Sequence, residues 1–167
     1  MIFSRGCEHA IRVLLYVAAH PAESPLAVRE IARALEVPSP TLAKIIQTLA
    51  RHGLLVSQKG PGGGVALGRS ADSVTLLDVV DLVDGPGLRT QCILGVPGCR
   101  EATTHCPLHD QWRIVRQRIL DVLEARSLEE LAGDLAGRDF VLAGSARDDV
   151  APPTARRRDK KRRTKEA

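Results

Sequence analysis

Three of the chain's four cysteines stand in one short segment, "CILGVPGCREATTHCPLH", at residues 92–109. Six residues separate Cys92 from Cys99, six more separate Cys99 from Cys106, and His109 follows close behind. Thiolate sulfur and imidazole nitrogen are the donors that iron–sulfur clusters and zinc take from proteins. Cys92, Cys99, Cys106 and His109 are therefore candidate metal ligands.

Three interpretations of this segment stay open on the residues alone. An iron–sulfur cluster suits three thiolates, and an imidazole in place of a fourth would raise its reduction potential. Zinc accepts a Cys₃His set, although zinc knuckles usually place paired cysteines about two to four residues apart. The third interpretation is a set of free thiols without metal. Cys7 lies elsewhere in the chain, and we expect it to be a small buried residue.

Composition favours a helical, cytoplasmic protein. The 167 residues include only four aromatic side chains, so Leu, Val, Ile and Ala must build the core, which suits packed helices better than a β-sandwich. No stretch is long and apolar enough to span a bilayer, and we expect no membrane partner. In the cytoplasm thiols stay reduced, which favours metal binding over disulfides.

Charge is distributed unevenly along the chain. Residues 1–70 carry eight Lys and Arg against four acids, residues 71–154 carry eight Arg against fourteen acids, and residues 155–167 carry eight bases against two acids. The basic first part indicates a polyanionic partner such as nucleic acid. For the basic tail, residues 145–167, the composition predicts disorder.

The first 70 residues predict a winged helix-turn-helix. Apolar residues at helical spacing predict helices over 6–20 and 27–35, and Ser39 with Pro40 predicts the N-cap and first residue of a third helix that stops at Gly53. Two short strands, 54–58 and 65–68, then flank "KGPGGG". The expected fold class is mainly α with a small β-hairpin wing and a long C-terminal dimerisation helix.

The third helix and the wing supply candidate DNA contacts. The outward side chains of that helix carry groups that read base edges or grip phosphates, with Ser39 suited to a phosphate at its start. Glycines let the wing enter a narrow groove beside a lysine. The candidate residues are Ser39, Thr41, Lys44, Gln47, Thr48, Arg51, Lys59, Gly60, Gly62 and Gly63.

Three further segments follow the wing. A connecting segment, 71–91, contains a helix that Thr75 and Asp78 open with a capping-box pattern. The cysteine-rich loop covers 92–109, and residues 107–137 are expected to hold a long helix and a short final one. Four apolar residues of the long helix form a seam that needs a partner, and we favour a second copy of the chain. These residues are Trp112, Val115, Ile119 and Val122.

Taken together, "VREIARALEVPSPTLAKIIQTLARHGLLVSQKGPGGGVALG" and "CILGVPGC" with "CPLHDQW" resemble the Rrf2 family of bacterial transcription regulators over about residues 1–135. The resemblance implies a homodimer on the long helix that binds double-stranded promoter DNA. It also implies an iron–sulfur cluster on Cys92, Cys99 and Cys106, with [2Fe–2S] expected rather than [4Fe–4S]. His109 matches a histidine that completes the ligand set, and Glu8 falls where some relatives supply an acidic ligand from the partner subunit.

The sequence departs from the family pattern in the DNA-binding region. Ala43 stands where relatives that read bases carry Glu, while Lys59 and Val65 replace the common Arg and Tyr of the wing. Lysine keeps the charge of arginine but not its flat hydrogen-bonding fork. The operator sequence of relatives therefore does not transfer to this chain.

The resulting hypothesis is a transcription regulator whose promoter binding is switched by an iron–sulfur cluster. The alternative is a constitutive winged-helix factor with free thiols or a structural zinc in the loop. An enzyme is disfavoured, because the sequence holds no nucleophile–base pair, cofactor loop or substrate-pocket motif.

Overall fold

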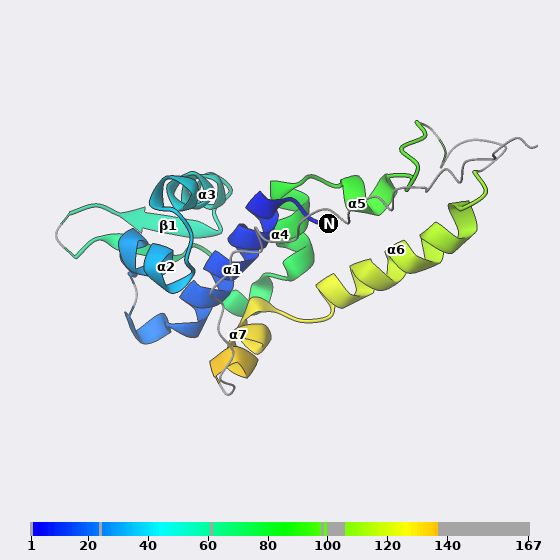
Figure 1. Cartoon of the computed structure of the whole chain (residues 1–167). Coiled ribbons are helices and arrows are strands. Elements are labelled where there is room, and N and C mark those ends of the chain that lie inside the picture. The colour runs from blue at the N-terminus through cyan, green and yellow to red at the C-terminus, as the bar shows by residue number, and fades with distance from the viewer. Residues whose placement is uncertain (1, 24, 61, 98, 100–105, 137–167) are drawn as a thin grey trace, which may run out of the picture.

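The computed structural model describes residues 2–23, 25–60, 62–97, 99 and 106–136. Mainly helices and one antiparallel hairpin are present, which confirms the predicted fold class of a winged helix (Figure 1). The predicted tail, 145–167, lies outside the described residues. In chain order the elements are α1 (Arg5–Ala19), α2 (Val28–Ala34), α3 (Ser39–Arg51), β1 (Leu55–Gln58), β2 (Gly64–Leu67), α4 (Leu76–Val83), α5 (Gly87–Thr90), α6 (His109–Glu124) and α7 (Leu128–Ala136).

Helix α1 is the central element of the body. It contacts α3, α4 and α7, and its buried side chains include Val13 and Leu14, both without exposed surface. Ser4 caps its start, because the Ser4 Oγ accepts a hydrogen bond from the Cys7 N–H at 3.0 Å. Any shift of α4 or α3 therefore has to be accommodated by α1.

The helix-turn-helix consists of α2, a tight turn and α3. The Arg12 guanidinium of α1 donates to the Leu35 carbonyl at 2.5 Å, which fixes the end of α2, and Glu36 takes a positive φ of 53° in the turn. The prediction of Ser39 as the N-cap is wrong by one residue: Pro38 occupies that position and Ser39 begins the helix. The reason is that the Pro38 carbonyl already accepts the first intrahelical bond, from the Leu42 N–H at 3.0 Å.

The hairpin pairs β1 with β2 in antiparallel register from Leu55 opposite Leu67 to Gln58 opposite Gly64. Leu26, just before α2, adds a bridge to Val65 through two backbone hydrogen bonds of 2.9 Å. Gly64 makes this bridge possible, since a Cβ there would collide with the Leu26 carbonyl oxygen. The wing is thus joined to the start of α2.

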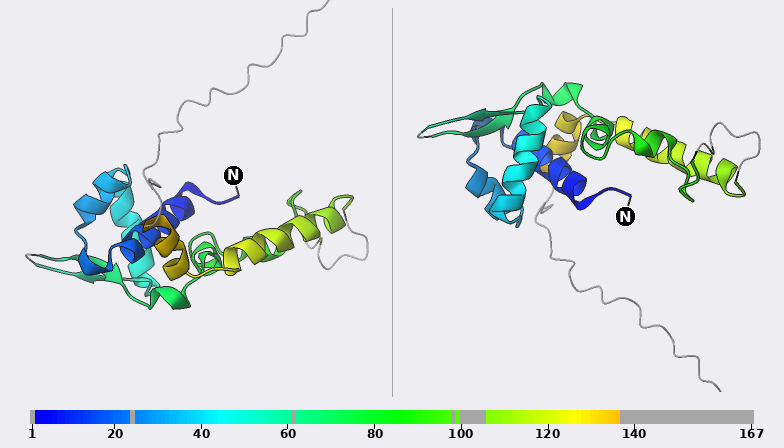
Figure 2. Two further views of the ribbon diagram at one scale, coloured as in Figure 1. Left: turned by 90° about the horizontal axis from the view of Figure 1, so that it is seen from below. Right: turned by 90° about the horizontal axis from the view of Figure 1, so that it is seen from above.

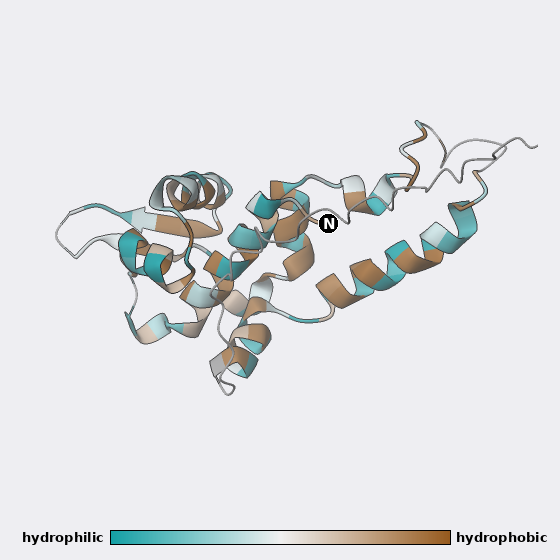
Figure 3. Ribbon diagram, viewed as in Figure 1, coloured by the Kyte–Doolittle hydropathy of each residue, from teal (hydrophilic) through white to brown (hydrophobic). Residues whose placement is uncertain are grey.

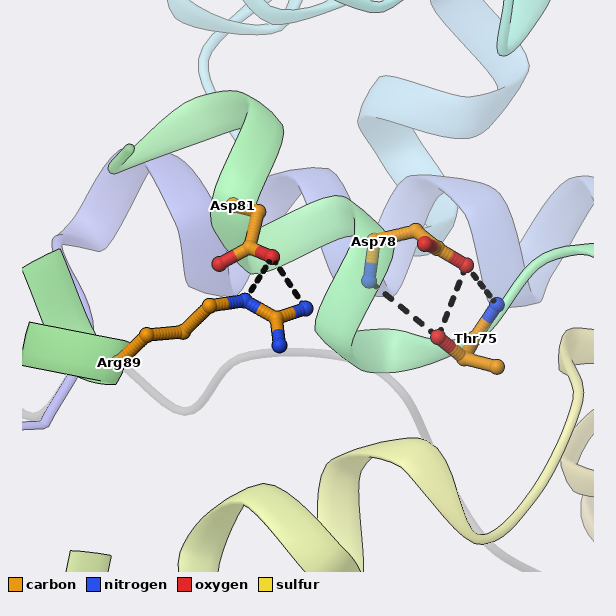
Figure 4. Close-up of polar contacts among 4 residues, drawn as sticks. All are labelled: Thr75, Asp78, Asp81 and Arg89. Carbon is orange, nitrogen blue, oxygen red and sulfur yellow. Dashed lines mark hydrogen bonds and ion pairs between the residues drawn. The ribbon is translucent and has the colours of Figure 1, made fainter. Parts of the chain in front are cut away.

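Helices α4 and α5 connect the body to the cysteine-rich loop. The predicted capping box is confirmed, with the Thr75 N–H donating to Asp78 Oδ2 at 2.8 Å and the Asp78 N–H donating to Thr75 Oγ1 at 3.3 Å (Figure 4). Arg89 of α5 forms an ion pair of 2.6 Å with Asp81 of α4. This pair holds α5 against α4 just ahead of Cys92.

Helix α6 runs away from the body, and the loop lies at its far end (Figures 1 and 2). Its inner end is anchored by Leu120 and Leu123, which pack with Cys7, Leu77 and Val80 of α1 and α4. The final helix, α7, folds back onto α1 and buries Leu128 and Ala132. Within the described ranges no helix is long and apolar enough to cross a membrane.

Candidate metal centre and nucleic-acid interface

The sulfur atoms of Cys92, Cys99 and Cys106, here called the sulfur triad, all lie within 4.8 Å of one another. The Cys92 and Cys106 Sγ atoms are 3.7 Å apart. No disulfide joins any of the four cysteines of the chain, all of which are among the described residues. Three thiols separated by six-residue gaps in sequence are thus gathered at one point in space, which is what a shared metal group requires.

His109 stands next to the sulfur triad. It is the first residue of α6, is half-buried, and its Nδ1 lies 3.6 Å from the Cys99 Sγ. A neutral imidazole nitrogen is a good ligand at such a place. The structure therefore brings together all four candidate ligands that the loop segment contains.

The protonation of the thiols differs around the site. The pKa of the Cys92 thiol is lowered, first by the backbone amide of Leu94 and then by that of Val96, which favours its thiolate form. The pKa of the Cys106 thiol is raised, chiefly by desolvation. Because the thiolate is the ligand form, Cys92 is the better prepared of these two donors.

Two side chains of α6 form hydrogen bonds to the backbone just before the cysteine-rich loop. The Trp112 Nε1–H donates to the Gln91 carbonyl at 2.9 Å, and the Arg116 guanidinium donates to the same oxygen at 3.2 Å. Gln91 directly precedes Cys92, so both bonds position the first ligand of the triad. The sequence assigned Trp112 to the dimer seam and missed this role. The signal was available in principle, because a partly buried indole N–H needs an acceptor.

Cys7 and Glu8 lie outside this group. Cys7 is fully buried, as predicted, and burial, followed by the charges of Asp84 and Glu8, raises the pKa of its thiol to about 12. Glu8 is exposed on α1, and among the described residues no carboxylate belongs to the metal-binding group. A single chain therefore does not bring Glu8 to the triad, and its predicted role as a ligand requires a second copy.

The exposed face of α3 presents the polar side chains expected there. Thr41, Lys44, Gln47 and Arg51 are exposed, whereas Thr48 is half-buried. Leu42, Ile45, Ile46 and Leu49 are buried on the other side. Ser39 is exposed at the start of the helix, next to this face.

The wing has the backbone conformation that its glycines predict. Gly60 and Gly62 take positive φ values of 109° and 77°, and Gly63 has no room for a Cβ against the Gln58 carbonyl. Lys59, Gly60 and Gly62 are exposed at the end of the hairpin and Gly63 is half-buried. The wing and the polar face of α3 are thus both available to a partner.

Comparison with known proteins gives consistent results. A family model named Rrf2, described as an iron-dependent transcriptional regulator, matches residues 3–134. The HTH-type transcriptional regulator IscR of Photorhabdus laumondii is 34% identical over 140 residues, which are 81% of this chain and 84% of that protein. IscR of Aliivibrio salmonicida is 34% identical over 131 residues, covering 78% and 76%.

Two solved structures resemble the fold. CymR, the global cysteine regulator of B. subtilis, superimposes with a TM-score of 0.66 at 22% identity over 79% of this chain and 96% of that one. IscR of T. potens superimposes with a TM-score of 0.66 at 20% identity over 82% and 90%. At these identities the structures support the shared fold.

Proposed function

This chain belongs to the Rrf2 family of transcriptional regulators, and from that premise we propose that it binds promoter DNA as a homodimer whose affinity is set by an iron–sulfur cluster. The observation that carries the proposal is the sulfur triad. Three thiols from a loop meet within 4.8 Å of one another beside the imidazole of His109.

The donor set fits an iron–sulfur cluster. Cys92, Cys99 and Cys106 would be its thiolate ligands, and His109, or Glu8 of the partner subunit, would be the fourth. A [2Fe–2S] cluster is the form we propose from the resemblance to the family. One histidine or carboxylate beside three thiolates would be a weaker, protonatable ligand suited to a reversible site. When bound, the cluster supplies a group that oxidation, nitric oxide or iron shortage can remove.

The chain's own residues determine what ligand binding does to the loop. With the three sulfurs sharing one group, Cys92, Cys99 and Cys106 would be held together beside His109 at the start of α6. Without it, exposed apolar side chains of the loop, such as Ile93 at 52% and Leu94 at 56%, have nothing to fix them. The proposed switch is therefore an order–disorder change of this loop.

A continuous set of contacts leads from the loop to the DNA-binding helix. Gln91 is bonded to Trp112, Arg89 ties α5 to α4, and the Asp84 carboxylate at the end of α4 accepts from the Ser4 N–H at 2.8 Å. Ser4 caps α1, and α1 packs on α3. We propose that these contacts transmit the state of the loop to α3.

DNA binding would use the two polar surfaces described above. Thr41 and Lys44, near the start of α3, would reach base edges in the major groove, and Gln47, Thr48 and Arg51 would extend that contact. Ser39 would meet a phosphate. Lys59 with Gly60, Gly62 and Gly63 would approach the minor groove or its phosphates.

Anaerobic purification tests the cofactor. Wild-type protein is expected to contain iron and acid-labile sulfide and to show visible charge-transfer absorbance. Cys106→Ala is expected to lose both metal and colour, while Cys7→Ala, the matched control, retains them. Colourless protein with zinc or no metal, still able to bind its promoter, would instead support the constitutive factor.

A further inference from the structure

Helix α2 presents two arginines that the groove-contacting elements do not include. Arg29 and Arg33 are both exposed and stand four residues apart, so they lie on one face of the helix about 5–6 Å apart at Cβ. That face is opposite the buried Ile31. Across the part of the chain that the structure describes, no hydrogen bond or ion pair holds either guanidinium.

The position of α2 is fixed relative to both groove-contacting elements. Its start is joined to the wing through the Leu26–Val65 bridge, and its end leads within four residues to the start of α3. The views in Figures 1 and 2 accordingly show α2 beside the hairpin and near α3. We therefore expect a duplex that contacts both the wing and α3 to run near α2.

Neither arginine is paired with the acids nearest to it in the sequence. Among the described residues, no ion pair joins Glu30 or Glu36 to Arg29 or Arg33. By contrast, Arg12 donates to the Leu35 carbonyl, and Arg69 donates to the His52 carbonyl at 3.1 Å. Arg29 and Arg33 thus remain as outward positive charge beside the proposed DNA path.

We propose that Arg29 and Arg33 form a phosphate clamp that holds the DNA backbone between the wing and α3. The inference rests on the proposed DNA binding and adds a contact that carries no base readout. Guanidinium groups suit phosphate oxygens, and such contacts fix the register of a protein on the duplex without selecting its sequence. The clamp contributes equally to promoter and unrelated DNA.

Salt dependence of binding tests the clamp. Fluorescence anisotropy would follow binding of the full chain to the duplex upstream of its own gene and to an unrelated duplex, from about 50 to about 300 mM KCl. Each phosphate contact contributes about 0.9 to the slope of log K against log salt. Because the proposed homodimer carries each arginine twice, Arg29→Ala and Arg33→Ala should each lower the slope by about 1.8 on both duplexes, and the double variant by about 3.6.

Two controls make the result decisive. Arg113→Ala removes an exposed arginine from α6 and should leave the slope unchanged, and the Arg29→Lys, Arg33→Lys double variant should keep it near the wild-type value. A wild-type slope in the double alanine variant, loss of slope in the lysine variant, or weakened binding to the promoter duplex alone would overturn the clamp. Absence of salt-dependent binding by the wild-type chain would instead overturn the proposed function, and the clamp with it.

Discussion

The backbone just before the sulfur triad is held in place through one carbonyl oxygen, that of Gln91. The Gln91 carbonyl accepts from both Trp112 and Arg116 of α6, one residue before Cys92. These two bonds join the loop to the helix that also carries His109. The geometry of the candidate ligands therefore depends on residues that are not ligands.

Replacing the indole tests this dependence. Trp112→Phe keeps an aromatic ring but removes the Nε1–H donor, so the loop entry is held by Arg116 alone. We expect the variant to lose its visible absorbance in air several-fold faster than wild type, while cluster-free protein binds DNA as before. Trp112→Ala, which removes the ring as well, should lose its visible absorbance faster still. If the absorbance of wild type and both variants decayed at the same rate, Trp112 would have no positioning role.

At the level of single residues, the sequence predicted four candidate donors, which the structure places together, but not the contacts that position them. Cys92, Cys99, Cys106 and His109 were identifiable because few residue types bind soft metals and four of them stand in one segment. The bonds to Gln91 were not, because the need of an indole N–H for an acceptor does not say which backbone carbonyl it meets. The same holds for the ion pair between Arg89 and Asp81, which links two elements whose packing the sequence does not specify.

Among the elements, α1 connects α4, which leads to the cysteine-rich loop, to α3. Ser4 donates to Asp84 through its N–H at 2.8 Å and its Oγ at 2.5 Å, and the same Oγ caps α1 (Figure 2 shows this end of α1 near the N label). The cap and one of the two bonds to α4 are thus made by the same hydroxyl. Its removal should affect both stability and coupling.

Ser4→Ala should lower the free energy of unfolding by about 1 kcal/mol, the usual contribution of an N-cap. It should also reduce the difference in DNA affinity between cluster-loaded and cluster-free protein. Thr75→Ala is the matched control, because it removes the N-cap of α4 without touching the contact between α1 and α4. Urea unfolding measures the change in stability, and DNA titrations measure the affinity of the cluster-loaded and cluster-free forms. If Ser4→Ala left the difference between those two affinities unchanged, the Ser4 contact would not transmit the state of the loop.

Two glycines should respond in opposite directions to the same substitution. At Gly64 a Cβ would collide with the Leu26 carbonyl and break the bridge between α2 and the wing, so Gly64→Ala should destabilise the fold. Gly133 lies in α7 with open space around its Cα, so Gly133→Ala should stabilise by about 0.5–1 kcal/mol. Denaturant unfolding of both variants measures the change in the free energy of unfolding. A change of the same sign in both variants would contradict the difference in space around Gly64 and Gly133.

Helix boundaries were predictable where capping was strong, as at the start of α4, and to within one residue at the start of α3. The place of α7 was not, because its short apolar pattern does not say which helix it covers. Helix α7 returns onto α1, and the Leu128 N–H donates to the carbonyl of Val74, just before α4, at 2.8 Å; both are long-range contacts. Such contacts arise from the packing of the whole chain.

In the whole molecule, α6 leaves part of its apolar surface uncovered. Val115 is 50% and Val122 is 73% exposed, whereas Ile119 of the same predicted seam packs with Leu120 and Leu123 against the body. Figure 3 shows apolar residues along the part of α6 that extends from the body. The seam is thus divided between the chain's own core and a surface that we propose is covered by the second copy.

Val122→Glu tests the dimer without disturbing the monomer, because the side chain it replaces is exposed. The new carboxylate would be buried without a partner in the dimer, so we expect the variant to sediment as a monomer and to bind promoter DNA at least about tenfold more weakly. Gln117→Glu adds the same charge to an exposed position of α6 and should remain dimeric. A dimeric Val122→Glu would place the interface elsewhere.

Whether a cluster sets DNA affinity is decided by titrating promoter DNA into one anaerobic preparation before and after removal of its iron, with the Cys92→Ala, Cys99→Ala, Cys106→Ala triple variant alongside. We expect the affinity to change by about 5- to 150-fold on iron removal, the usual range for coupled sites, and the triple variant to match the iron-free protein. Equal affinities in all three samples would show that DNA binding does not depend on the cluster.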